Sequence, residues 1–315
     1  MLDTPILFIV FNRIDTAQKV FDRIRQAQPK RLYIACDGAR NVYIYDSINI
    51  NKTRSLTKQV DWPCEVFTNF LDHNEGPKHA IFRFIKWFFE HEEQGIILEH
   101  DCLPHPDFFI YCETLLNRYK DNPRIGIISG SSIFTTQRLN SYTYTSYSLL
   151  WGWGTWRRVI DKYTLDLNDI DRKEFQAIAR HRSLSPIERC YMRFIFNHFK
   201  KNKIQTWDYP LGFCLGKHRM LSISPDRNLI ANIGFDPYAE NTTNRHSPSA
   251  NRPTYPILPL QFNDNIVPDR QNDYNCFRTF IVENEPAAYV YLKIILKEIG
   301  IFPLLMKIKK RVLKS

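Results

Sequence analysis

Short apolar runs alternate with helical stretches along the first 130 residues of the chain. Ile6–Phe11, Arg31–Ala35 and Gly95–Leu98 are runs of mainly branched or aromatic apolar residues. Such runs are typical of strands buried in a parallel sheet. Residues 15–25 and His79–His91 have apolar positions at helical spacing. The alternation of strand, helix and strand predicts βαβ units and therefore an α/β fold.

The rest of the chain has weaker patterns. Short strands are predicted at Cys64–Thr68, Ile125–Ser129, Leu221–Ser224 and Asn228–Ile233. Ser141–Tyr147 alternates polar and aromatic residues. Residues 161–200 look helical, and Glu188–Lys201 is the clearest case. Residues 236–275 are rich in Asn, Pro, Thr and Asp and have little periodicity. We expect loops there that wrap the domain and include a mobile lid.

Polar clusters follow the predicted strands where each strand ends. These clusters are Asn12-Arg13, Asp37-Gly38 and Glu99-His100-Asp101. Because open α/β sheets bind ligands at the carboxyl ends of their strands, the clusters predict a ligand crevice along one sheet edge.

Glu99 and Asp101 are the carboxylates of the last cluster, and Pro104 and Pro106 force a turn soon after them. Carboxylates one residue apart on a turn suit Mg²⁺ or Mn²⁺ shared with a diphosphate. They could instead solvate the start of the next helix, which Asp107 could cap. These residues alone leave both interpretations open.

Two aromatic stretches have open interpretations as well. In Trp151–Arg158 the tryptophans could pack in the core or form a flexible wall over a pocket, and the spacing favours core packing. Asp208 lies among aromatic residues in Thr206–Pro210. Partial desolvation would raise its pKa towards that of a general base, but Asp208 could equally be a helix N-cap.

The composition predicts a packed protein with an uneven charge. Of the 315 residues 43% are hydrophobic, and the formal net charge is +10. Residues 289–315 hold seven basic residues and one acidic residue, a net charge of +6. Basic residues concentrated in a tail argue against a nucleic-acid partner. The same tail alternates apolar residues with lysines as two short helices broken at Gly300 and Pro303, which suits an anionic membrane surface. A helix docked on the domain is the other interpretation.

The cysteines and the apolar stretches of the chain predict where in the cell the protein is found. Its seven cysteines include no C-x-x-C pair, which favours reduced thiols. We expect a cytoplasmic protein because the start does not resemble a signal peptide and no apolar stretch is long enough to span a bilayer. The chain also has no P-loop, no dinucleotide fingerprint, no nucleophile elbow and no zinc-ligand spacing.

An ordered set of motifs resembles the GT-A fold nucleotide-sugar glycosyltransferases. The likeness is to bacterial family 2-like or nucleotide-diphospho-sugar transferases, related to N-acetylglucosaminyltransferase I. The motifs cover roughly residues 4–245: TPILFIVFNR, YIACDG, NEG, GIILEHDCLPHPDFF, SLLWGWGTWRR, TWDY and LSISPDRNLIANIGF. The resemblance implies a Rossmann-like fold with a mixed, mostly parallel central sheet flanked by helices. It also implies a transferase domain over residues 1–260, divided into a nucleotide-binding half (1–130) and an acceptor and catalytic half (131–260). Residues 261–315 would be an extension with basic amphipathic helices.

The resemblance assigns roles to individual residues. Nucleotide and donor contacts fall on Asn12, Arg13, Asp37, Asn74, His79, Glu99 and His100. In the metal motif Asp101 would hold Mn²⁺ or Mg²⁺. Trp153 would form a wall of the sugar and acceptor region, and Asp208 would deprotonate the acceptor hydroxyl. The family usually has an acid where this chain has His100, and that departure puts the identity of the donor in question.

The resemblance implies a metal-dependent, inverting transferase that moves a sugar from a nucleotide diphosphate, UDP above all, to a glycan or lipid-linked acceptor. Such an enzyme would act in surface polysaccharide synthesis, in the cytoplasm or peripherally on the inner face of the plasma membrane. The alternatives are a nucleotidyltransferase or nucleotide-sugar hydrolase, and a degenerate scaffold that only binds.

Overall fold

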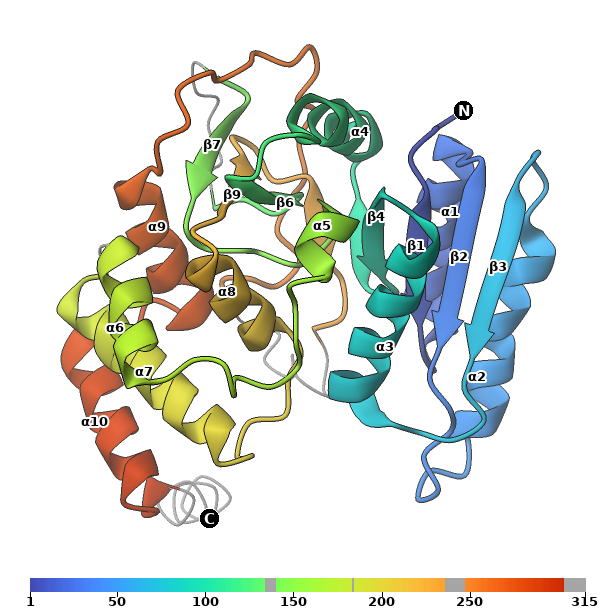
Figure 1. The fold of residues 1–315 in the computed structure, drawn as a ribbon. Helices are drawn as coiled ribbons and strands as arrows, with labels where there is room; N and C mark the ends of the chain where they lie inside the picture. The colour runs from blue at the N-terminus through green and yellow to red at the C-terminus, as the bar shows by residue number, and fades with distance from the viewer. Residues whose placement is uncertain (134–139, 183, 236–246, 303–315) are drawn as a thin grey trace.

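A mixed eight-stranded sheet forms the centre of the protein in the computed structural model, which describes residues 1–133, 140–182, 184–235 and 247–302 (Figure 1). Its strands run in the order β3-β2-β1-β4-β8-β6-β9-β7. Their bounds are β1 Ile6–Val10, β2 Arg31–Cys36, β3 Glu65–Phe70, β4 Gln94–Glu99, β6 Ile125–Ser129, β7 Tyr142–Thr145, β8 Trp153–Trp156 and β9 Leu221–Pro225.

The first half of the sheet is parallel. Strand β1 pairs with β2 and with β4, so that Ile6 lies opposite Leu32 on one side and Ile96 on the other. All five residues of β1 are buried, as the continuous apolar run predicts. Strand β3 completes this half at the edge of the sheet. The predicted α/β fold, a mostly parallel sheet flanked by helices, is confirmed.

The second half of the sheet mixes directions. Strand β8 runs antiparallel between β4 and β6, β9 is parallel to β6, and β7 is antiparallel to β9. A separate antiparallel pair joins β5 (Cys102–Pro104) to β10 (Ile230–Asn232). This pair brings the segment that follows Asp101 next to the segment that precedes Gly234.

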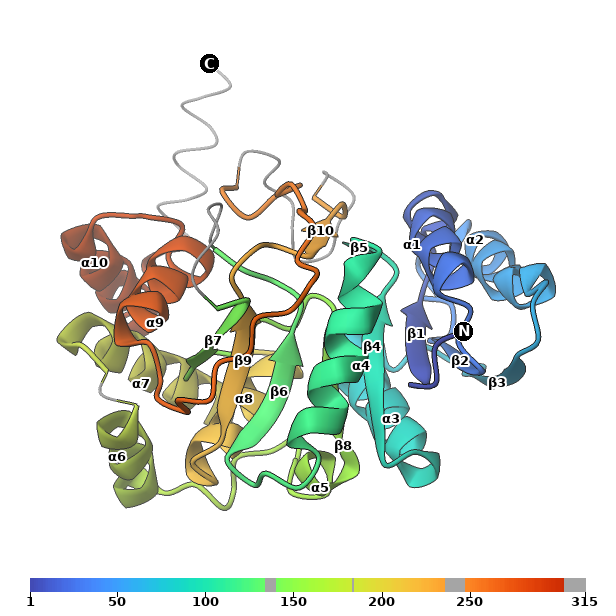
Figure 2. The same cartoon turned by 90° about the horizontal axis from the view of Figure 1, so that it is seen from above.

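Helices cover both faces of the sheet. On the parallel half, α1 (Ile14–Ala27) and α2 (Asp46–Arg54) lie on one face and α3 (Gly76–His91) on the other (Figures 1 and 2). The other helices are α4 (Asp107–Tyr119), α5 (Arg157–Ile160), α6 (Arg172–His181), α7 (Pro186–Lys200), α8 (Asp208–Lys217), α9 (Arg270–Cys276) and α10 (Ala287–Glu298), with a 3₁₀ turn at Ser55–Gln59 and a π-helix at Phe277–Ile281. No helix in the described ranges is long and apolar enough to cross a membrane.

Two hydrophobic cores hold the protein together. The larger core surrounds the sheet, and the smaller one gathers apolar side chains of α6–α8 and of the chain after residue 275. Helix α7 begins with a capping box between Ser185 and Glu188, a pattern that favours a helix start at this point. Phe277 is fully buried in the smaller core. The described part of the predicted C-terminal extension is therefore packed against the second half of the chain.

The predicted C-terminal helices fall partly within the described residues. The first corresponds to α10, and Gly300 follows it with a φ of +77°, a conformation that glycine adopts readily. The second helix, beyond Pro303, lies outside the described residues, as does the part of the predicted lid at 236–246. Residues 247–269 are loops apart from an isolated bridge at Pro268.

Candidate active site

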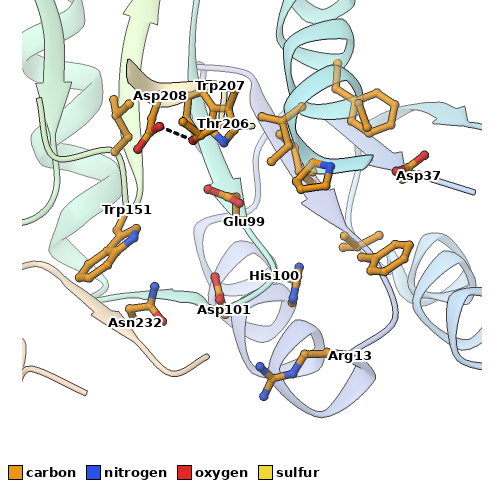
Figure 3. Close-up of a pocket in the computed structure, with 18 of the residues that line it drawn as sticks. Arg13, Asp37, Glu99, His100, Asp101, Trp151, Thr206, Trp207, Asp208 and Asn232 are labelled. Carbon is orange, nitrogen blue, oxygen red and sulfur yellow. Dashed lines mark hydrogen bonds between the residues drawn. The ribbon is translucent and has the colours of Figure 1, made fainter. Parts of the chain in front are cut away.

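A cavity of about 420 Å³ lies at the carboxyl ends of the parallel strands. Eight of the predicted site residues line this cavity: Asp208 and seven others. They are Asn12, Arg13, Asp37, Asn74, Glu99, His100 and Asp101. Figure 3 shows the carboxyl groups of Asp208, Glu99 and Asp101 one after another along the cavity, with Trp151 on one side and Asp37 farther away on the other.

The strand register explains why these residues meet. Val10 lies opposite Cys36, and Ile9 lies opposite Glu99. The three strands therefore end at nearly the same level, and the residues that follow them leave the sheet side by side. Polar side chains are tolerated there because the apolar runs have already ended.

The opposite wall comes from segments that are far apart in the sequence. It comprises residues 148–151, the stretch 205–208 before and at the start of α8, Asn232 after β10, and Phe280 and Ile281 of the π-helix. We call residues Asn12–Arg13, Asp37, Asn74 and 99–101 the sheet wall, and this second set the helical wall. Phe280 and Ile281 have no sequence signal that connects them to a site. Thr206 and Asn232 do lie within the TWDY and LIANIGF motifs.

Asp37 holds the sheet wall in shape. Its Oδ1 accepts hydrogen bonds from the backbone N–H groups of Gly38 (2.8 Å) and Glu75 (2.9 Å), and its Oδ2 accepts from Gly76 N–H and the Asn74 amide, both at 2.9 Å. A carboxylate has about four acceptor positions, so the protein itself occupies those of Asp37. Asp37 and Asn74 therefore fix the turn that starts α3.

A second network, which the sequence did not reveal, supports the other end of the sheet wall. The Asn12 amide donates to Asp46 Oδ1 over 2.7 Å, and Arg40 donates to both carboxylate oxygens of Asp46 over 2.6 and 3.0 Å. Arg40 also lines the cavity. This bidentate pair holds Asn12 and Arg40 in fixed positions.

Asp101 is packed against Gly234. The backbone carbonyl of Asp101 accepts a hydrogen bond from Ile233 N–H at 2.9 Å, and Arg13 donates to the Gly234 carbonyl at 3.1 Å. A Cβ atom on Gly234 would lie 2.1 Å from Asp101 Oδ2. Any residue other than glycine at position 234 would therefore push the Asp101 carboxylate out of this orientation.

Burial and two neighbouring carboxylates destabilise the charged form of Glu99. Burial, followed by the charges of Asp101 and Asp208, raises the pKa of Glu99 to about 8. Burial also raises the pKa of Asp208. A bound cation would relieve this repulsion.

The donor set fits a cation that the substrate helps to hold. In the part of the chain that the structure describes, no three His, Cys, Asp or Glu side chains converge as a complete metal site. Mg²⁺ typically takes one or two carboxylates from the protein and completes its shell with phosphate oxygens and water. Glu99 and Asp101 suit that arrangement.

Neither Glu99 nor Asp101 caps helix α4. The N-cap residue of α4 is Pro106, which makes no side-chain cap bond. The Asp107 carboxylate accepts instead from Ile257 N–H at 2.9 Å and Leu258 N–H at 3.2 Å.

Asp208 is the first residue of α8, and Trp207 occupies the N-cap position. Its Oδ1 accepts from Tyr209 N–H at 2.8 Å and from the Thr206 hydroxyl. The other oxygen, Oδ2, makes no hydrogen bond to any residue that the structure describes. One oxygen is therefore fixed while the second can accept a proton within the cavity.

Two of the predicted site residues lie away from the cavity. Trp153 is 1% exposed, stacks on Trp207 with ring centroids 5.9 Å apart, and does not line the cavity, because β8 points it into the core. His79 is exposed on α3 and borders a separate shallow hollow with Arg83 and Trp87. The face of α3 that lines the cavity carries Ala80, Ile81 and Phe84 instead.

Trp151 supplies the aromatic wall that was expected from Trp153. The Ser131 hydroxyl donates to the Trp151 carbonyl at 3.0 Å, and Gly130 N–H donates to the Gly152 carbonyl at 2.8 Å. Gly152 has a φ of +62°, which favours glycine. The Trp151 ring packs edge-to-face with Phe235 and Phe280 at centroid distances of 5.8 and 5.6 Å. These bonds and contacts anchor the wall on several sides.

Comparison with known proteins finds faint likenesses to solved structures. No protein-family model matches the chain, and no curated protein matches its sequence. A UDP-glucose pyrophosphorylase complexed with UDP-glucose has 10% identity and a TM-score of 0.39 over 73% of this chain and 93% of its own. HddC from Yersinia pseudotuberculosis has 11% identity and a TM-score of 0.31 over 51% and 80%. The inositol-1-phosphate CTP transferase from T. maritima has 9% identity and a TM-score of 0.30 over 51% and 74%. Likenesses this slight carry no conclusion about the activity of this chain.

Proposed function

We propose that the protein is a metal-dependent glycosyltransferase of the GT-A type. The observation that carries this proposal is the single cavity in which the strand-end polar residues face Asp208 across Glu99 and Asp101. A cavity of about 420 Å³ is within the usual range for small-molecule sites. The donor is a nucleotide-diphosphate sugar, with UDP as the nucleotide.

The donor diphosphate occupies the region between the sheet wall and the carboxylates. Asp101, with Glu99 beside it, holds Mn²⁺ or Mg²⁺. When bound, the cation neutralises charge on the departing nucleoside diphosphate. Arg13 adds a fixed positive charge near Asp101, since its guanidinium bonds to the Gly234 carbonyl. His100, at the position between the two acids, contacts the donor sugar or ribose.

Asp208 acts as the general base. The acceptor hydroxyl oxygen attacks the anomeric carbon, the bond from that carbon to the diphosphate oxygen breaks, and Oδ2 of Asp208 takes the hydroxyl proton. Burial raises the pKa of Asp208, which makes the carboxylate a stronger base. Attack from the face opposite the diphosphate inverts the configuration. Thr206 and Tyr209 N–H orient the carboxylate by holding Oδ1.

The acceptor is a glycan or lipid-linked saccharide that enters beside the helical wall. Trp151 and Phe280 offer aromatic surface there. The basic C-terminal residues attract the enzyme to the inner face of the plasma membrane, where lipid-linked acceptors of surface polysaccharide synthesis reside.

Calorimetry with UDP, with and without Mn²⁺, tests the proposal first. We expect UDP to bind only when the metal is present. Incubation with a panel of UDP-sugars, with and without saccharide acceptors, then separates transfer from hydrolysis. Absence of metal-dependent UDP binding would leave the degenerate scaffold as the explanation, and hydrolysis at the same rate with and without acceptor would indicate a nucleotide-sugar hydrolase.

A further inference from the structure

Four consecutive apolar or aromatic side chains project from the turn that precedes α2. Val42, Tyr43, Ile44 and Tyr45 are 83%, 54%, 88% and 72% exposed. We call these four residues the apolar tip. Single exposed apolar residues are ordinary on protein surfaces, but a contiguous group of this kind marks a site of interaction.

The tip is held in place by its own hydrogen bonds. Tyr43 N–H donates to the Arg40 carbonyl at 3.2 Å, and Asp46 N–H donates to the Tyr43 carbonyl at 3.0 Å. The Arg40 guanidinium lies over the Tyr43 ring, 3.9 Å from its centroid. These contacts fix the backbone of the turn and the Tyr43 ring, which reduces the ordering that is needed when a partner binds.

A second exposed apolar surface lies on α10. Tyr289, Leu292, Ile295 and Ile299 are 43%, 49%, 54% and 59% exposed, and their spacing places them along one side of the helix and its end. Val290 and Ile294, on the other side, are buried against the smaller core. Figure 1 shows the far end of α10 and the turn before α2 at the same, lower end of the molecule, on opposite sides.

The charge of the chain identifies the kind of surface that these groups fit. The formal net charge is +10, and residues 303–315, which follow α10, contain five basic residues and no acidic one. Arg40 lies against the Tyr43 ring of the tip, and Lys52 is exposed in the last turn of α2. Separated apolar groups accompanied by basic residues match an anionic bilayer, whose interface accepts aliphatic and tyrosine side chains while its headgroups attract lysine and arginine.

We propose that the apolar tip inserts into the interface of an anionic lipid bilayer while the exposed side of α10 lies along the same surface. The tip connects directly to the cavity, because Asp46 bonds to both Arg40 and Asn12, and both of these line the cavity. Insertion therefore brings the sheet wall to the lipid surface. This inference adds a contact in the N-terminal half to the basic C-terminus, and it does not depend on glycosyl transfer.

Cosedimentation with lipid vesicles tests the proposal on the full-length chain without donor or metal. The vesicles are pure phosphatidylcholine, or phosphatidylcholine with about a third phosphatidylglycerol. We expect binding to the anionic vesicles, and roughly tenfold or greater loss of partitioning for the Val42→Ser, Ile44→Ser double variant because each deleted methyl or methylene group weakens burial. Equal binding by the wild type and the double variant, or no binding to anionic vesicles, overturns the proposal.

The matched control replaces an exposed isoleucine elsewhere. Ile110 is 52% exposed on α4, which lies at the opposite, upper end in Figure 1. Ile110→Ser should bind vesicles as the wild type does. Sedimentation velocity distinguishes a protein partner: a wild-type dimer that the double variant converts to monomer, with vesicle binding unchanged, would show that the tip joins two copies and would overturn the lipid assignment. Metal-dependent UDP binding, measured separately, reports on the proposed function alone.

Discussion

The two walls of the cavity are built in different ways. Side chains of the sheet wall follow consecutive parallel strands and bond to one another, as Asp37 and Asn74 do. The helical wall collects Trp151, Asp208 and Phe280 from distant segments, and Asp208 keeps one carboxylate oxygen without a bond to the described residues. In the proposed function the sheet wall binds the donor, and the helical wall carries the reacting group.

Replacing Asp208 should have the largest effect on activity. Asp208→Asn keeps the shape of the side chain but cannot take a proton, so we expect transfer to fall about 10³-fold. Binding of UDP with Mn²⁺ should be unchanged, because the sheet wall is intact. Asp161→Asn, an exposed position in the same half of the chain, is the control. A fully active Asp208→Asn enzyme would remove the proposed base and with it the division between the walls.

Replacing Asp37 should strongly lower stability. Asp37→Ala leaves three backbone N–H groups and the Asn74 amide without their acceptor. We expect the free energy of unfolding to fall by about 3 kcal/mol, measured by urea denaturation. Asp72→Ala, at an exposed position of the neighbouring loop, should change it by less than about 0.5 kcal/mol. A similar value for both variants would show that these four bonds contribute little.

Replacing Gly234 with alanine (Gly234→Ala) tests how the two walls fit together, because this residue packs against Asp101 of the sheet wall. The added methyl group displaces the Asp101 carboxylate, so we expect Mn²⁺-dependent UDP binding to weaken about tenfold in calorimetry. Gly212→Ala, in α8, is the control because an added Cβ there meets no atom within 4 Å. Unchanged UDP binding by the Gly234 variant would mean that the orientation of Asp101 is unimportant for the metal.

The pH dependence of stability tests the carboxylates that lie between the two walls. The pKa of Glu99 is raised in the folded protein to about 8 from an ordinary 4.5, so the folded state holds the proton more tightly than the unfolded state. Glu99 therefore makes metal-free protein less stable as the pH rises from 4.5 to 8. The Tm of Glu99→Gln should fall less than that of the wild type over this interval, and Mn²⁺ should raise the wild-type Tm at pH 8. Parallel Tm curves for the two proteins would contradict the electrostatic argument.

The sheet wall could be predicted from the sequence and the helical wall largely could not. The sheet wall is predictable because apolar runs end at Asn12, Asp37 and Glu99. Parallel pairing in register brings the ends of these strands together independently of the loops that connect them. Phe280 reaches the cavity only because the π-helix packs into the smaller core, a long-range arrangement without local periodicity. Trp153 and Trp151 are two residues apart, but β8 begins at Trp153, and Gly152, with a φ of +62°, separates Trp151 from the strand.

The position of β8 limits how the protein could be divided for engineering. This strand comes from the second half of the chain but pairs with β4, the last parallel strand of the first half. Residues 1–130 produced alone would leave the β4 edge unpaired and apolar, a template for aggregation. A chimera that exchanges residues 1–130 should therefore carry Trp153–Trp156 with that segment, or provide a complementary strand in its place.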